Sequence, residues 1–190
     1  MVITADALRE QLGLYLGWGY SPGDPRYPCA LPGVRLPQSP PRQTNCCAFV
    51  EGLAVGAAVR SGADPGWSLA RHKRAMIYDP ADRAGPVEVL TAAGLADPVA
   101  VDRPPPVWSI CQGWRGPRGH TFAIGDVEGD AVAIIEANRG YGLDGVGWRG
   151  HGVATDVAPP MLWHRDPRAW TWAGVLAVYP EIYACALRVG

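Results

Sequence analysis

Two proline-rich segments limit what this chain of 190 residues can form. Residues 21–42 contain seven prolines, and Pro104, Pro105 and Pro106 form an uninterrupted triplet. Because proline fixes φ and has no N–H donor, neither segment can lie inside a helix or a central strand. Helical spacing dominates before the triplet and strand-like runs follow it. We therefore expect an extended surface loop over 21–42 and an α+β fold whose helices precede its strands.

The composition indicates a single folded domain over residues 1–190. Hydrophobic residues make up 48% of the chain and eight residues are tryptophan, a content that disordered chains lack. The formal charge of −1 does not mark a nucleic-acid binder. Neither a signal peptide nor a run of about 18 apolar residues is visible, so we expect no membrane span. We also expect a monomer that is made in the cytoplasm and has no cofactor and no metal site.

Four segments before the proline triplet have helical patterns. The most apolar of them begins at Cys46 after a natural N-cap, which is either Thr44 or Asn45. Gly52 and Gly56 lie four residues apart on this helix, and this predicts a smooth face where another backbone comes close. The expected helices span 5–16, 43–62, 67–78 and 86–94.

The segments after the triplet are rich in Val, Ile, Trp and Phe between glycine-rich turns, which is typical of antiparallel strands. A hairpin centred on Gly129 would pair residues whose numbers sum to 258, provided that its loop is odd-numbered. His120 would then lie opposite Asn138 and Phe122 opposite Glu136, with all four side chains on one face. The expected strands span 107–114, 120–126, 131–138 and 170–179, with a further strand in the last residues.

The five cysteines are an odd set without Cys-x-x-Cys spacing, which fits neither a disulfide framework nor a zinc cluster. Cys46 stands apart because the first turn of a capped helix favours the thiolate, the nucleophilic form. His120 opens a strand and is the candidate base, with Asn138 or Glu136 to orient its imidazole. We expect packing roles for Cys47, Cys111 and Cys185, and solvent exposure for Cys29, His72, His151 and His164.

These segments resemble the papain-like cell-wall hydrolases of the NlpC and CHAP types. TNCCAFVEGL is similar to the family's helix-start motif, GHTFAIGD to its glycine–histidine strand, and IIEAN to the Glu-x-Asn of the third catalytic position. The order of cysteine, histidine and polar residue also agrees. LGLYLGWGY is a weaker match to the family's Tyr-x-Trp-Gly segment and leaves the tyrosine's role open between Tyr15 and Tyr20.

The resemblance implies a papain-like core, with N-terminal helices packed on a C-terminal antiparallel sheet, and a cysteine amidase or endopeptidase. Cys46 would attack an amide carbonyl and His120 would protonate the departing amine. Cys47 stands where the family usually has serine, but the alignment favours Cys46 as the nucleophile. The implied substrate is the stem peptide of peptidoglycan, in a bacterial or phage setting. Without an export signal, the enzyme would need lysis, a phage particle or a secretion system for delivery.

Residues around the motifs are expected to contact the substrate. Asn45, Tyr20 and Trp18 flank the cysteine motif, while Tyr141 and Trp148 lie in a glycine-rich segment that is either a flexible loop or a substrate-binding rim. Two other functions stay open. One is acyl transfer on the same thiol, as in transglutaminase-like proteins, which usually have an aspartate at the third position. The other is a papain-like binding or structural module without turnover, which predicts a buried, unreactive thiol.

Overall fold

The structure of the protein is a computed structural model. For residues 19–20, 43, 69, 118, 138–139 and 144–150 it describes the backbone alone. The proline-rich segment 21–42, with Cys29, lies outside the described residues, as do His151 and His164. The described residues are 1–15, 19–20, 43–77, 79, 81–116, 118–139, 144–150 and 171–190.

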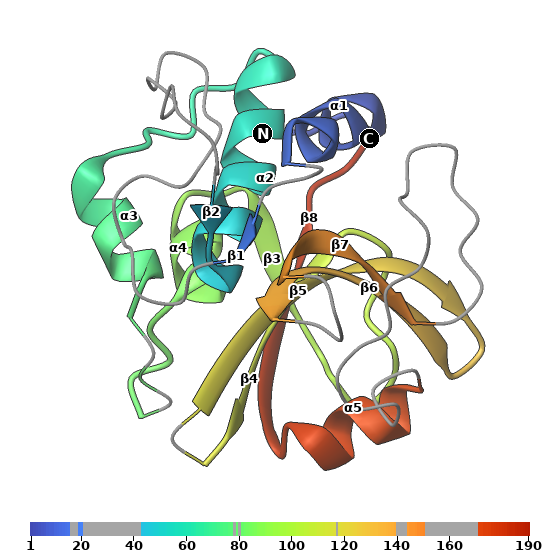
Figure 1. Ribbon diagram of the computed structural model, residues 1–190. Helices are drawn as coiled ribbons and strands as arrows, with labels where there is room; N and C mark the ends of the chain where they lie inside the picture. The colour runs from blue at the N-terminus through green and yellow to red at the C-terminus, as the bar shows by residue number, and fades with distance from the viewer. Residues whose placement is uncertain are drawn as a thin grey trace.

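The described chain has an α+β fold in which helices precede a mainly C-terminal antiparallel sheet (Figure 1). Among the described residues, none of the helices has both the length and the apolar character needed to cross a membrane. The helices are α1 (Ala5–Tyr15), α2 (Cys46–Arg60), α3 (Leu69–Ala75), α4 (Pro86–Ala92) and α5 (Trp172–Val178).

The main sheet has the strand order β3-β8-β4-β5-β6-β7, and each neighbouring pair is antiparallel. A separate pair of two-residue strands, β1 and β2, is parallel and brings the residues after α1 beside those directly before α2. The strands are β1 (Gly19–Tyr20), β2 (Gln43–Thr44), β3 (Ala96–Val99), β4 (Ser109–Arg115), β5 (Arg118–Glu128), β6 (Ala131–Arg139), β7 (Asp144–Gly150) and β8 (Glu181–Leu187).

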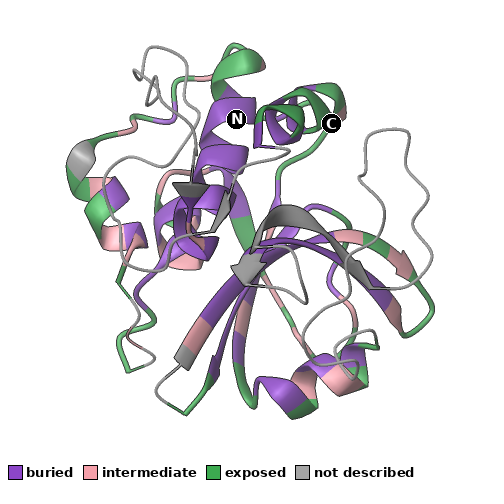
Figure 2. Ribbon diagram, viewed as in Figure 1, coloured by how far each residue is buried: buried purple, intermediate pink, exposed green. Residues whose placement is uncertain are grey.

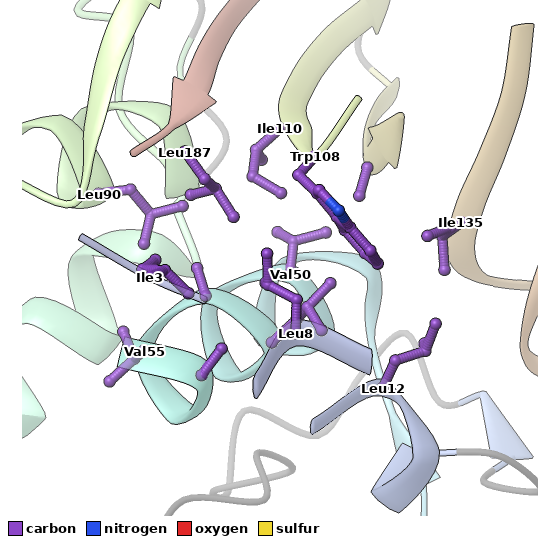
Figure 3. Packing of buried hydrophobic residues seen from close by; sticks show 14 of the residues in the cluster. Ile3, Leu8, Leu12, Val50, Val55, Leu90, Trp108, Ile110, Ile135 and Leu187 are labelled. Atoms are coloured by element: carbon purple, nitrogen blue, oxygen red, sulfur yellow. The ribbon is translucent and has the colours of Figure 1, made fainter. Parts of the chain in front are cut away.

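The sheet has a hydrophobic cluster on each face. On one face, Leu8 of α1 and Val50 of α2 pack with Ile110 and Ile135 of the sheet (Figure 3). α2 is buried along nearly its whole length (Figure 2), because it is apolar on all sides and lies between α1 and the sheet. α5 covers the other face, so alternate residues of each strand supply the two clusters (Figure 1).

The face of α2 that carries Gly52 and Gly56 contacts a side chain, and not another backbone as predicted. Gln11 of α1 donates from Nε2 to the carbonyl oxygen of Gly52 at 3.1 Å, and its Oε1 accepts a 2.8 Å hydrogen bond from Arg60. A Cβ atom on Gly56 would lie 2.2 Å from Gln11 Nε2. A larger residue at position 56 would therefore require the buried, hydrogen-bonded Gln11 amide to move.

One prediction about the C-terminal half is wrong, and the glycine-rich segment has more regular structure than a loop. The segment 170–179 contains helix α5, whose N-cap Thr171 accepts a hydrogen bond from the Gly174 N–H at 3.1 Å. Its buried residues Trp172, Val175 and Val178 recur every three positions, and this helical spacing overrides their β propensity. The glycine-rich segment after the hairpin is not simply a loop, because residues 144–150 form β7 and pair with β6. β3 was not predicted.

Candidate active site

Helix α2 begins at Cys46, directly after its N-cap Asn45. The Asn45 side chain accepts a 2.8 Å hydrogen bond from the Ala48 N–H, which identifies Asn45 as the cap. Its amide nitrogen also donates to Met76 Sδ at 3.7 Å, at the end of α3. The Cys46 thiol thus lies in the first turn, at the positive end of the helix dipole, as the sequence predicts.

The β5–β6 hairpin has the predicted register near the histidine, but its turn and its bulge differ from the prediction. Ala123 pairs with Ile135, so the partner numbers sum to 258 as expected. At the turn, however, Glu128 pairs with Ala131, which leaves a two-residue loop and makes the prediction of an odd-numbered loop wrong. A β-bulge at Gly125 inserts one residue into β5 and restores the register.

His120 and Glu136 form a buried pair on adjacent strands. His120 Nε2 lies 2.5 Å from Glu136 Oε2, and the Glu136 side chain is fully buried. The imidazole also stacks near the rings of Phe122 and Tyr179, with centroids 5.9 Å and 6.3 Å away. Gly113 lies opposite His120 on β4, where a Cβ atom would come within 2.7 Å of Tyr179 Cβ. A carboxylate and two aromatic rings therefore hold the imidazole in place.

The same imidazole is hydrogen-bonded to the Cys46 side chain. Burial by itself lowers the pKa of His120, but the charge of Glu136 and the hydrogen bonds to Cys46 and Glu136 outweigh it and raise this pKa to about 10. The ordinary value is 6.5, so His120 is an imidazolium at neutral pH. A cation bonded to a thiol at a helix start favours the thiolate.

The adjacent thiol of Cys47 has a different neighbour. Its Sγ lies 3.6 Å from Thr121 Oγ1, and both residues are fully buried. Thr121 faces α2, while the neighbouring His120 belongs to the opposite alternation of β5. The hydrogen bond to His120 is made by Cys46. Cys111 and Cys185 are also buried in the two clusters, as expected for packing residues.

The structure brings some of the other predicted residues close to this site and leaves others undescribed. The backbone of Tyr20 pairs with Thr44, directly before the cap, and Trp148 pairs with Ile135 in β7. Asn138 lies on β6 two residues beyond Glu136, with its backbone opposite Gly145. The substrate-binding predictions for Trp18 and Tyr141 fall outside the described residues.

Tyr15 is part of the core. Its ring packs edge-on against Phe49 of α2, with centroids 5.2 Å apart, and the residue has no exposed surface. Edge-to-face aromatic contacts of this kind stabilise the packing of two helices. Of the two tyrosines that the sequence left open, Tyr15 therefore has a packing role here.

A second buried histidine–glutamate pair was missed. His72 Nδ1 of α3 lies 2.5 Å from Glu51 Oε2 of α2, and neither side chain has more than 1% of its surface exposed. The prediction that His72 is solvated is therefore wrong, because α3 packs on α2. A signal was present: Glu51 is the one charged residue between Cys46 and Arg60, and a buried acid needs a partner.

Comparisons with models of known protein families, with characterised proteins and with solved structures gave no match to this chain. The described residues contain no group of three or more His, Cys, Asp or Glu side chains arranged to hold a metal ion. The chemistry available at this site is that of a thiol, an imidazole and a carboxylate in contact.

Proposed function

We propose that this chain is a cysteine hydrolase with a papain-like core that cleaves amide bonds. The observation that carries the proposal is the position of His120, which is bonded to Cys46 on one side and to Glu136 on the other. A nucleophile, a base and a group that orients the base are the three parts that such catalysis needs. Cys46 is the nucleophile, His120 the acid and base, and Glu136 the orienting residue.

The geometry supports a two-step mechanism. His120 Nε2 is bound to Glu136, so Nδ1 is the nitrogen left to face the Cys46 sulfur. The thiolate attacks the amide carbonyl, and the imidazolium gives its proton to the departing amine as the C–N bond breaks. Neutral His120 then takes a proton from water, which attacks the thioester; the C–S bond breaks, the acid is released and the thiolate–imidazolium pair is restored.

The start of α2 supplies the donors for the oxyanion. The first N–H groups of a helix have no acceptor within that helix, and Cys46 is the first residue of α2. Its N–H can meet the negative oxygen that forms when its own sulfur attacks. Asn45 contributes by capping this turn, and its predicted direct contact with substrate remains a prediction.

Glu136 takes the third position in this proposal in preference to Asn138. A buried carboxylate bonded to the imidazole stabilises the imidazolium and holds the ring orientation. An asparagine there would orient the ring without supplying charge. The role of Asn138 stays a prediction.

The resemblance to NlpC and CHAP enzymes points to stem peptides of peptidoglycan as the substrate class. Digestion of purified sacculi is the direct test, with the released fragments identified by mass. We expect new amino and carboxyl termini from the native chain and none from Cys46→Ser. If an added amine is acylated faster than water attacks, the transglutaminase-like alternative is correct instead.

Thiol reactivity tests the assignment of the residues. At mildly acidic pH only a thiol held as the thiolate reacts quickly with iodoacetamide. We expect modification of Cys46 in the native chain, loss of this reaction in His120→Ala, and full retention in Cys47→Ser. Labelling at Cys47 or Cys111 would contradict the assignment, and the absence of any labelling would favour a papain-like module without turnover.

A further inference from the structure

A second concave site lies at the edge of the sheet, away from the thiol. A cavity of about 490 Å³ that is open to solvent is lined by α4, by the end of β3 with the two residues after it, and by β8. Eight of its twelve lining residues are apolar, and none of them is a residue of the proposed triad. Its volume lies in the range of small-molecule sites. Its apolar residues include Val87, Val99, Val101, Ile182 and Ala184.

The cavity lies where the outer strand of the sheet, β3, ends. Glu181, Ile182 and Tyr183 pair with β4 on one side, but the pairing of β8 with β3 ends at Ala184. The first three residues of β8 therefore have no β3 partner, and the cavity extends along two of them. The lining of this gap is mainly apolar, which suits a hydrocarbon chain.

The charges around the cavity leave one cation uncompensated. Glu88 lines it, but its carboxylate is bound by Arg74 Nε at 2.7 Å. Arg83 also lines it, and no carboxylate of the described residues forms an ion pair with Arg83. The guanidinium instead lies over the Tyr183 ring, 4.5 Å from its centroid. The cavity therefore favours an anion over a cation.

The Arg83 head group is in a position to bind a carboxylate. The Arg83 guanidinium lies over the Tyr183 ring, and its N–H donors match the two oxygens of a carboxylate. The backbone of Arg83 has φ +56°, a left-handed conformation that non-glycine residues seldom adopt. Such conformations cluster at ligand sites.

We propose that this cavity binds a small amphipathic acid, with an apolar tail between α4 and β8 and a carboxylate on Arg83. A medium-chain fatty acid has this chemistry. The site is separate from the thiol chemistry and does not depend on it. Octanoate is therefore a suitable probe, and Cys46→Ser binds it as the native chain does.

Titration of the full chain with octanoate, followed by calorimetry, tests the proposal. We expect saturable binding that weakens about tenfold or more in Arg83→Gln, since a charge-assisted hydrogen bond is lost. Ala92→Phe adds a ring from an exposed position on the cavity wall and should abolish binding. Arg9→Gln is the matched control, because Arg9 is an exposed arginine of α1 that pairs with Asp6, and it should bind like the native chain.

Four results would overturn the proposal. The first is the absence of saturable octanoate binding to the native chain. The second is equal affinity for octanoate and octylamine, which would show that Arg83 does not select an anion. The third is unchanged octanoate affinity in both Arg83→Gln and Ala92→Phe while circular dichroism shows that both are folded. Tighter binding of an apolar peptide amide than of octanoate would assign the cavity to a peptide and reject the acid.

Discussion

Two histidine–glutamate pairs in this chain have the same 2.5 Å contact and are both buried, yet their surroundings differ. His120 with Glu136 also contacts the Cys46 thiol. His72 with Glu51 lies near the Trp67 ring and joins α3 to α2. The same local chemistry therefore supports a catalytic proposal in one place and holds two helices together in the other. The two pairs differ in a further side chain beside the histidine, which is the Cys46 thiol for His120 and the Trp67 ring for His72.

Removing the carboxylate charge from each pair separates these roles. In Glu136→Gln the charge that raises the pKa of His120 is gone, so burial dominates and this pKa falls. We expect the pH at which His120 loses its proton, and with it the pH profile of Cys46 alkylation, to move down by about 1–3 units, since a charge partner shifts a pKa by about this much. The rate of iodoacetamide labelling against pH is the measurement.

Glu51→Gln is the matched control, because it makes the same change in the other buried pair. We expect it to lower the free energy of unfolding, since the change weakens a buried hydrogen bond, and to leave the pH profile of Cys46 labelling unchanged. A similar shift of the profile in both variants would show that the effect is general destabilisation, and would remove the special role of Glu136.

Helix α2 is the element that joins the core to the site. Its cap and its apolar run are local features, and both are readable from the sequence around Asn45 and Cys46. The residue of α1 that packs against α2 is not readable from the local sequence. Gln11 lies 41 residues before Gly52 in the chain, and its side chain fills the space above Gly56. No local sequence pattern could reveal this contact.

Two glycine-to-alanine changes in the paired helices should have opposite effects. At Gly56 a Cβ would meet the Gln11 amide at 2.2 Å, so we expect Gly56→Ala to lower the free energy of unfolding by about 1–3 kcal/mol. At Gly13 of α1 nothing lies within 4 Å, and Gly13→Ala should raise it by about 0.5–1 kcal/mol through backbone entropy. Urea unfolding measures both, and two changes of the same sign would contradict the packing described.

Secondary structure was predictable where a local signal was unambiguous. The helix from Cys46 and the strand with His120 follow from a cap, a periodicity and a turn. The prediction of a strand in the segment of α5 was wrong because its residues favour strands but also recur at helical spacing. Only burial against the second face of the sheet distinguishes the helix from the strand. The register was correct only because the bulge at Gly125 offset a wrong turn length.

For the whole molecule, the raised pKa of His120 links the site to stability. Its pKa is about 10 in the folded protein and 6.5 ordinarily, so the folded state binds the proton more tightly. The stabilisation is complete below about pH 6.5 and is lost as the pH rises through about 10. The free energy of unfolding should therefore fall between pH 6.5 and 10.

Urea unfolding of the native chain and of His120→Gln at a series of pH values measures this dependence. We expect the two curves of stability against pH to lie furthest apart near pH 6 and to converge toward pH 10, because the variant cannot bind the proton. Parallel curves would show that the histidine is not a source of the pH dependence.

The amino-acid sequence alone was sufficient for the α+β class, the helix start at Cys46 and the strand with His120. These depend on caps, periodicity and turn residues, which act over a few positions. The contact of His120 with both Cys46 and Glu136, the partner of His72, helix α5 and the cavity beside Arg83 required the tertiary structure. Each of these depends on residues far apart in the chain, whose contact is set by how helices and strands pack and not by their neighbours in sequence.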